Sequence, residues 1–291
     1  MPRLTLIGFG EAGRTFAAAG GWGVQARVYD IKTDSPATAM DMRAAYARHG
    51  VTGCGSAADA LAGAQLVLSL VTADQATPAA QEAARHIAPG ALFCDLNSVS
   101  PGRKRANAAA IEAAGGHYAD IAVMAPVQPA ALNVPLLISG PDADTAADML
   151  RSIGFTRMQI CGAAIGAASA TKMVRSVMVK GIEALTAEMM LAADAAGVTQ
   201  GVLASLGGDW AAKADYNLDR MLAHGTRRAA EMEEVAQTLL ELGIDPLMTQ
   251  GTIIRQRAMG AMLQGAPMPE GLDSKLTVIK DRHPEPVTGS A

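Results

Sequence analysis

Short apolar runs alternate with alanine-rich, helix-like segments in the first half of the chain. The strand-like runs fall at residues 4–7, 26–30, 65–71, 91–96, 117–123, 134–139 and 157–161. Helix-like patterns occupy residues 74–87, 102–114 and 142–153. Such alternation is typical of a parallel sheet with helices on both faces. We therefore predict an N-terminal α/β domain with a doubly wound parallel sheet.

The pattern changes after residue 162. Residues 167–196 contain no proline and a single glycine, Gly181, which predicts one long helix of about 30 residues and about 45 Å. Because it is apolar nearly all round, we expect it to be buried centrally. Further helices are predicted at 200–205, 209–223, 226–242 and 246–263, and the proline-rich tail from 267 is expected to be loosely held. The prediction is a domain at 1–162 and an all-helical domain at 163–291, joined by the long helix.

A glycine-rich turn stands between the first strand and the first helix. Gly8 can make the tight turn, Gly10 lets a pyrophosphate approach the backbone, and Gly13 lets the helix pack closely on the strand. The free N–H groups of the helix would then face the phosphates. The predicted dinucleotide contacts are Gly8, Phe9, Gly10, Glu11, Ala12 and Gly13, with Val71 at the end of the 65–71 run.

A carboxylate ends the second strand at the distance that this turn requires. Asp30 lies 20 residues after Gly10, where it can accept hydrogen bonds from the ribose hydroxyls of NAD and would repel a 2′-phosphate. Lys32 is a cation that could instead accept the 2′-phosphate of NADP. We predict NAD as the coenzyme, with NADP as the alternative.

Composition and charge narrow the class of protein. The chain has 291 residues, half of them hydrophobic, and a net charge of −4. No basic run is long enough for nucleic acid, and Arg103-Lys104-Arg105 is expected to be a solvated helix face. The three cysteines are far apart and indicate neither a disulfide framework nor a metal site. Without a signal-peptide pattern or an apolar run of ~18 residues, we expect a cytoplasmic protein that does not contact a membrane.

Polar side chains follow the 91–96 strand. Asn97 and Ser98 can bind the nicotinamide ribose or the substrate. The alternative is a helix cap, with Ser98 or Ser100 at the cap and Pro101 in the first turn.

A lysine enters the long helix soon after a hinge between Gly162 and Gly166. Lys172 has apolar flanks and needs a partner or a solvent-lined cleft. Beside a cationic nicotinamide its pKa should fall, which suits proton exchange with an alcohol. Ser176, one turn further, could hold a substrate oxygen, and Arg175 could meet a carboxylate. The alternative is a surface lysine that extends from the edge of the helix.

The order of these features resembles the 3-hydroxyacid dehydrogenase family, relatives of 6-phosphogluconate dehydrogenase. The resemblance covers nearly the whole chain and rests on the turn at 8–13, Asp95-x-Asn97-Ser98-x-x-Pro101, Gly162-x-x-x-Gly166 followed by Lys172, and Leu242-Gly243-x-x-Pro246. It implies a Rossmann domain with a helical domain, and an NAD(P)-dependent oxidoreductase acting on a small hydroxy acid, with Lys172 as general acid and base. It also implies a homodimer formed through the helical domains.

The sequence departs from the family where the substrate binds. The family's D-x-P-V-S-G-G segment falls on residues 120–126, so that its serine is Met124 and its glycines are Ala125 and Pro126. We expect the amides near Met124 and Ala125 to orient the substrate. The family's helix asparagine is Ser176, and its late K-D pair falls on Ala230-Glu231.

The sequence therefore does not identify the substrate. Arg175, Arg227 or Arg228 could bind its carboxylate. The best match is a divergent, phosphogluconate-dehydrogenase-like branch with Lys172-Met-x-Arg-Ser and Lys180-Gly-x-Glu-Ala-Leu. One alternative is a reductase of imines or non-acid carbonyls, and another is a nucleotide-binding protein without turnover.

Overall fold

The computed structural model describes residues 2–263 and 265–282. The chain divides into two compact units, Met1–Met173 and Val174–Ala291. The division falls inside a helix, whereas the predicted boundary at residue 162 comes before that helix begins.

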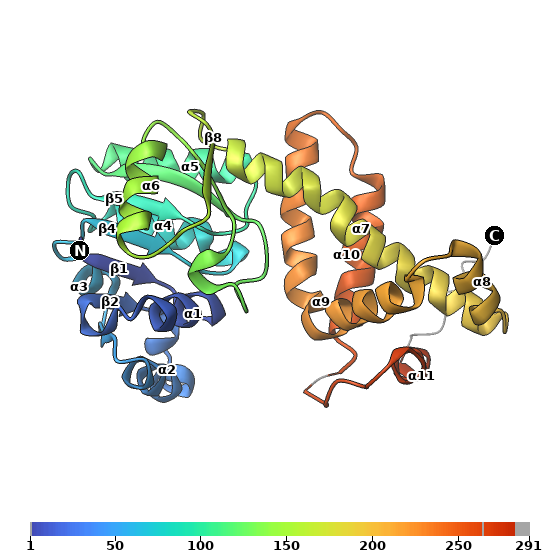
Figure 1. The fold of residues 1–291 in the computed structure, drawn as a ribbon. Helices are drawn as coiled ribbons and strands as arrows, with labels where there is room; N and C mark the ends of the chain where they lie inside the picture. Colours follow the sequence, from blue (N-terminus) through green and yellow to red (C-terminus); the bar gives the residue numbers. More distant parts are fainter. Residues whose placement is uncertain (1, 264, 283–291) are drawn as a thin grey trace. The chain divides into compact units, whose positions relative to one another are not determined.

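An eight-stranded sheet forms the centre of the first unit, counted over the described residues (Figure 1). Its strands lie in the order β3-β2-β1-β4-β5-β6-β7-β8. The strands are β1 (Leu4–Ile7), β2 (Ala26–Tyr29), β3 (Thr52–Gly53), β4 (Leu66–Ser69), β5 (Leu92–Asp95), β6 (His117–Val123), β7 (Leu136–Ser139) and β8 (Met158–Gly162). The seven predicted runs are all strands, and the two-residue β3 is too short to give a sequence pattern.

The sheet is not wholly parallel, which corrects the sequence prediction. β7 pairs antiparallel with β6, while the other neighbours are parallel. The connection from β6 to β7 holds only the 3-10 turn η4 (Ala131–Asn133) instead of a crossover helix. A parallel return would require such a crossover, so here the chain reverses its direction.

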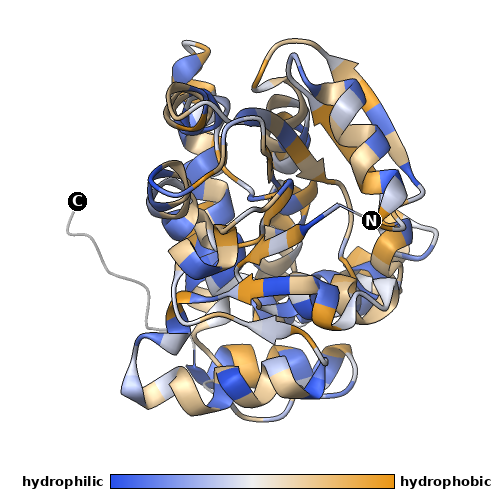
Figure 2. Ribbon diagram, turned by 90° about the vertical axis from the view of Figure 1, so that its left-hand side faces the viewer, coloured by the Kyte–Doolittle hydropathy of each residue, from blue (hydrophilic) through white to orange (hydrophobic). Residues whose placement is uncertain are grey.

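Helices cover both faces of the sheet. They are α1 (Glu11–Gly20), α2 (Pro36–Arg48), α3 (Ala57–Leu61), α4 (Ala76–Ala84), α5 (Pro101–Ala113) and α6 (Ala143–Ser152), with short 3-10 turns η1 (Gly23–Gln25), η2 (Ile31–Thr33) and η3 (Ala73–Gln75). Leu66 and Leu68 of β4 pack in the cluster that holds side chains of α1, α2 and α6. Val67, between them, packs with side chains of α3, α4 and α5. Figure 2 shows hydrophobic residues recurring along the strands, as this two-sided burial requires.

The second unit is helical. α7 (Ala167–Ala195) begins in the first unit and continues into the second, followed by α8 (Thr199–Leu206), α9 (Trp210–Glu241), α10 (Leu247–Gly260) and α11 (Leu272–Arg282). Its core includes Met190, Leu218, Met221 and Ile279. Over residues 2–263 and 265–282, none of the helices combines the length and apolar character needed to span a membrane.

The predicted helix break at Gly225 is wrong. The chain continues as one helix through Gly225, where we predicted a break. A Cβ on Gly225 would lie 2.2 Å from the backbone oxygen of Gln256 and 2.6 Å from the nitrogen of Gly260. This glycine therefore permits α9 and α10 to cross closely and does not end a helix.

Two further expectations were wrong. α7 is not buried all round, because Met178 is 67% exposed and Val174 and Leu185 are exposed with it. The segment after residue 267 is not wholly loose, because it forms α11, where Lys275 lies 2.8 Å from Asp215. The remainder of that tail, residues 283–291, lies outside the described residues.

Candidate functional site

The three glycines of the first turn have three different surroundings. Gly8 has a φ of +94°, and a Cβ there would lie 2.6 Å from the Leu70 carbonyl oxygen. A Cβ on Gly13 would lie 2.9 Å from the Gly8 oxygen, so this glycine permits α1 to pack on the strand end. At Gly10 a Cβ would meet no protein atom within 4 Å. The space at Gly10 is thus left open to a ligand, and no side chain caps α1 there. Both features fit a pyrophosphate at the helix N-terminus.

Asp30 braces this turn from the end of β2. Its Oδ2 accepts a 2.7 Å hydrogen bond from the Phe9 amide, and its Oδ1 accepts a 3.0 Å bond from the Lys32 amide. Each carboxylate oxygen has a second lone pair, so Asp30 can still accept from ribose hydroxyls. The side chain of Lys32 is exposed.

Asn97 joins the ends of two neighbouring strands. Its Oδ1 accepts a 2.7 Å hydrogen bond from the Val71 amide, and its Nδ2 donates 2.9 Å to the Ser69 hydroxyl. The side chain is buried. Asn97 therefore holds the backbone of Val71, the residue predicted to contact the coenzyme.

Lys172 and Ser98 are in direct contact. The ε-amino group of Lys172 donates a 2.6 Å hydrogen bond to the Ser98 hydroxyl, and both side chains are half-buried. Ser100 is the residue that caps α5, by accepting from the Arg103 amide. The two serines thus divide the roles that the sequence left open: Ser100 caps the helix, and Ser98 meets the lysine.

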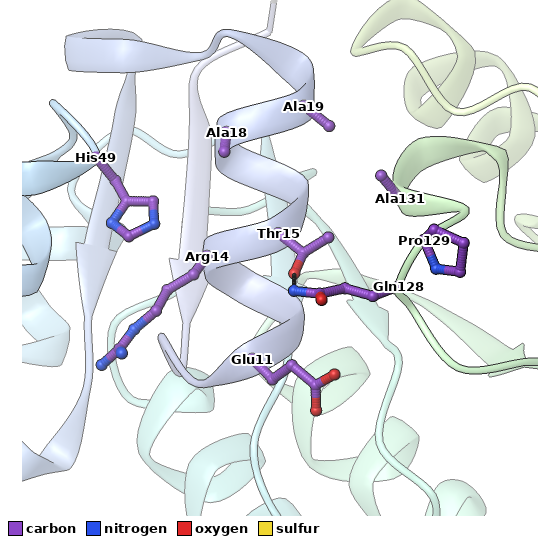
Figure 3. A pocket seen from close by; sticks show the side chains of 9 residues that line it. All are labelled: Glu11, Arg14, Thr15, Ala18, Ala19, His49, Gln128, Pro129 and Ala131. Carbon is purple, nitrogen blue, oxygen red and sulfur yellow. Dashed lines mark hydrogen bonds between the residues drawn. The ribbon is translucent and has the colours of Figure 1, made fainter.

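The segment after β6 is tied to α1. The Met124 amide donates 2.9 Å to the Pro135 carbonyl oxygen, so that this donor is engaged within the β6–β7 connection. The next residue, Ala125, is exposed. Further along the chain, the side-chain amide nitrogen of Gln128 donates a 3.3 Å hydrogen bond to the Thr15 hydroxyl (Figure 3). A groove of about 660 Å³ lies beside this contact, along the outer side of α1.

Three predicted substrate residues belong to the second compact unit. Ser176 accepts a 3.4 Å hydrogen bond from the Lys180 ammonium group. Arg228 is buried, and its Nε donates 3.0 Å to Glu183. Arg175 is exposed. A substrate carboxylate at Arg228 would therefore compete with Glu183 for the guanidinium group.

A buried lysine lies beneath the end of β5, and sequence reasoning missed it. The Lys104 side chain is 0% exposed, and its Nζ lies 2.6 Å from the Asp95 carbonyl oxygen. The same nitrogen lies 3.0 Å from Asp95 Oδ1 and 3.3 Å from Asp120 Oδ1. The predicted solvated face is wrong for this residue, although Arg103 and Arg105 beside it are exposed. The available signal was its spacing from the buried Asn107, Ala108 and Ile111 on α5, which places all four on one helix face.

Tyr118 completes the surroundings of Asp95. Its hydroxyl donates 2.7 Å to Asp95 Oδ2. Burial, with the charge of Asp95, raises the pKa of this phenol well above its ordinary value. Tyr118 therefore stays a neutral donor.

Comparisons with known proteins identify the type of the first unit. The sequence profile described as the NAD binding domain of 6-phosphogluconate dehydrogenase matches residues 3–166, and a domain of unknown function matches residues 193–259. No curated protein matches the sequence significantly. The first unit is thus an NAD(P)-binding domain of the Rossmann type.

Solved structures extend the similarity to the helical unit. A conserved hypothetical protein from Sinorhizobium meliloti 1021 is 37% identical over 97% of both chains, with a TM-score of 0.74. The conserved protein MTH1747, of unknown function and described as similar to 3-hydroxyacid dehydrogenases, is 32% identical over 91% of this chain and 100% of its own, with a TM-score of 0.68. The 3-hydroxyisobutyrate dehydrogenase of Mycobacterium tuberculosis shares the fold at 20% identity over 97% and 99% of the two chains, with a TM-score of 0.71.

Proposed function

Because this chain belongs to the family defined by the NAD-binding domain of 6-phosphogluconate dehydrogenase, we propose that it is an oxidoreductase that acts on a CH–OH group. It would move a hydride between nicotinamide and a hydroxy acid or related alcohol. The observation that carries this proposal is the contact between Lys172 and Ser98. Ser98 follows the carboxyl end of β5, the edge at which doubly wound sheets bind their ligands.

The chemistry divides between coenzyme and protein. Bound NAD(P) would supply the hydride acceptor or donor. The Lys172 ε-amino group would take the proton of the substrate hydroxyl during oxidation and return it during reduction. The Ser98 hydroxyl accepts a hydrogen bond from that amine and so fixes its direction.

The coenzyme would be NAD in preference to NADP. The Asp30 carboxylate is held in place by two backbone amides, so it cannot easily turn away from a 2′-phosphate. Lys32 is exposed beside it, and this cation is the feature that would favour NADP.

The substrate would be larger and less polar than a short hydroxy acid. Met124 stands where the resembling family has a serine, and its amide is engaged with Pro135. Neither its side chain nor its amide is then suited to a carboxylate, whereas methionine adapts to irregular apolar shapes. The carboxylate of the substrate would be bound by Arg175 or Arg227, since Arg228 already forms a hydrogen bond with Glu183.

A homodimer through the helical unit would cover the exposed apolar side of α7. Val174, Met178, Ile182 and Leu185 are exposed and recur every three or four residues, which places them along one stripe. Sedimentation equilibrium tests this. We expect a dimer for the native chain and a monomer for Met178→Glu with Leu185→Glu, and a native monomer would contradict the dimer.

A substrate panel tests the activity itself. Short and larger hydroxylated acids and alcohols are incubated with NAD or NADP, and reduced coenzyme is followed by absorbance. We expect turnover that Lys172→Ala and Ser98→Ala diminish. Lys213→Ala is the control and should match wild type, because Lys213 pairs with Asp209 and is not part of the proposed site. Coenzyme binding without turnover of any compound would favour a nucleotide-binding protein instead.

A further inference from the structure

The two members of the Lys172–Ser98 contact come from separate elements. Ser98 lies in the segment between β5 and α5, and Lys172 lies in the second turn of α7. Their hydrogen bond therefore depends on how these two segments are held against each other. Both segments are connected to the same buried cation, Lys104, through Asp95 and Asp120.

On the Ser98 side, Lys104 holds the last residue of β5. Its ammonium group donates to the Asp95 carbonyl oxygen at 2.6 Å and to the Asp95 carboxylate at 3.0 Å. The same carboxylate oxygen accepts a 2.9 Å hydrogen bond from the Asn97 amide. The backbone that leads into Ser98 is thus fixed from below.

On the Lys172 side, Lys104 reaches α7 through Asp120. The ammonium group lies 3.3 Å from Asp120 Oδ1. The other carboxylate oxygen accepts from the Ser169 amide at 3.0 Å and from the Ser169 hydroxyl at 3.1 Å. Ser169 precedes Lys172 by three residues, so both lie on one face of α7.

The charges explain why one residue can hold both sides. Asp95, Asp120 and Lys104 all have fully buried side chains. Two buried carboxylates without a cation between them would be strongly unfavourable, and removing one partner of a buried ion pair leaves an uncompensated charge. The group between the carboxylates therefore determines how closely Asp95 and Asp120 approach, and with them the segments they carry.

We propose that Lys104 is a positioning residue that sets the contact between Lys172 and Ser98. Its role in turnover rests on the proposed function, but its effect on the Lys172 environment does not. The proposal concerns a residue of α5 that touches neither the coenzyme turn nor the reacting groups.

The test measures the environment of Lys172 without a substrate. Trace amounts of acetic anhydride label the folded, full-length protein, and peptide mass spectrometry gives the rate of Lys172 acetylation. Lys104→Met removes the charge and keeps the length of the side chain. Ile111→Val is the matched control, because Ile111 is buried on the same helix and lies outside the polar cluster. Circular dichroism and melting temperatures establish that each variant is folded.

A double-mutant cycle shows whether Lys104 acts through the contact. We expect Lys104→Met to change the Lys172 labelling rate by about threefold or more, and Ile111→Val to leave it within about twofold. Ser98→Ala should change the rate in the native protein but add nothing in the Lys104→Met background.

The proposal is overturned if folded Lys104→Met labels like wild type, or if the two substitutions act additively. Should Lys104→Met fail to fold, Ser169→Ala takes its place, because it removes one hydroxyl and keeps the backbone donor to Asp120. An unchanged labelling rate in Ser169→Ala would then overturn the proposal. Titration of the native protein with NAD separates a failure of the proposed function from a failure of the positioning role of Lys104. If the native protein does not bind NAD, the proposed function is contradicted, but the positioning role is not.

Discussion

The ε-amino group of Lys172 lies 2.6 Å from the hydroxyl oxygen of Ser98, a residue 74 positions earlier in the chain. Lys172 is therefore not a lysine that extends into solvent from the edge of a helix. The contact brings the amine that we propose as the proton-exchanging group to the carboxyl end of β5, in the unit that also carries the glycine turn.

Lys172→Ala should remove most turnover and leave the coenzyme dissociation constant nearly unchanged. The reason is that a positioned acid or base typically contributes ~10²–10⁴-fold to the rate, while the proposed coenzyme contacts lie in the glycine turn. Steady-state kinetics and fluorescence titration measure the two quantities. Near wild-type turnover in the variant would show that Lys172 has no role in proton transfer.

NAD should bind more tightly than NADP, by about tenfold or more, which corresponds to ~1.4 kcal/mol. The carboxylate of Asp30, which we propose accepts hydrogen bonds from the ribose hydroxyls, is fixed by the Phe9 and Lys32 amides. Titration of both reduced coenzymes by fluorescence decides the order. Tighter binding of NADPH would instead assign the 2′-phosphate to Lys32, and Lys32→Ala should then abolish that preference.

Gly10→Ala should fold normally but bind NAD about tenfold or more weakly. A Cβ at Gly10 meets no protein atom within 4 Å, so only a bound pyrophosphate would be displaced. Gly13→Ala is the contrasting variant, because its Cβ would lie 2.9 Å from the Gly8 oxygen and overpacking costs about 1–3 kcal/mol of stability. Equal NAD affinity in Gly10→Ala and wild type would place the pyrophosphate elsewhere.

Larger hydroxylated compounds should have a higher kcat/KM than short 3-hydroxy acids. A thioether cannot satisfy a buried carboxylate, and Met124 has no hydroxyl to offer one. Met124→Ser should shift the preference toward the short acids, whereas Met178→Ser, on the exposed side of α7, should not. Efficient turnover of 3-hydroxyisobutyrate or 3-hydroxypropionate by the native chain, with larger compounds rejected, would refute this interpretation.

Lys275→Met should loosen α11 below pH ~10 and have less effect at higher pH. Burial lowers the pKa of Lys275, but hydrogen bonds to Asp215 and Asp219 outweigh it and raise the pKa above its ordinary 10.5. Stability from such a group is complete below the unfolded-state pKa and disappears as the pH rises through the folded-state pKa. Hydrogen exchange of the α11 amides should show a loss of about 1–3 kcal/mol in the variant near pH 8.

Lys280→Met is the matched control for this pair. Lys280 also lies on α11 and also contacts an aspartate, Asp194, but it is exposed, and exposed ion pairs contribute little. Equal effects of the two substitutions would mean that the burial of Lys275 does not matter.

Local patterns in the sequence determined the α/β unit and its coenzyme turn. Burial on both faces of the sheet makes the strands read as apolar runs, and a Cβ on Gly8 or Gly13 would lie within 3 Å of a backbone oxygen. The 29-residue α7 was equally legible, because nothing between residues 167 and 195 interrupts a helix. Each of these features has a signal in adjacent residues, so the sequence alone was enough to predict it.

Contacts between distant segments decided what the sequence left open. In the sequence, Gly225 indicates a helix break. In the structure it lies inside α9 and permits the close approach of Gly260 in α10. Lys104 reads as part of a solvated basic run, and only the approach of Asp95 and Asp120 makes its burial favourable. The pairing of Lys172 with Ser98 is of the same kind, because it exists only once β5 and α7 are packed together. A charged or small residue carries no local sign of the partner that will compensate it, and that partner is supplied by the tertiary structure.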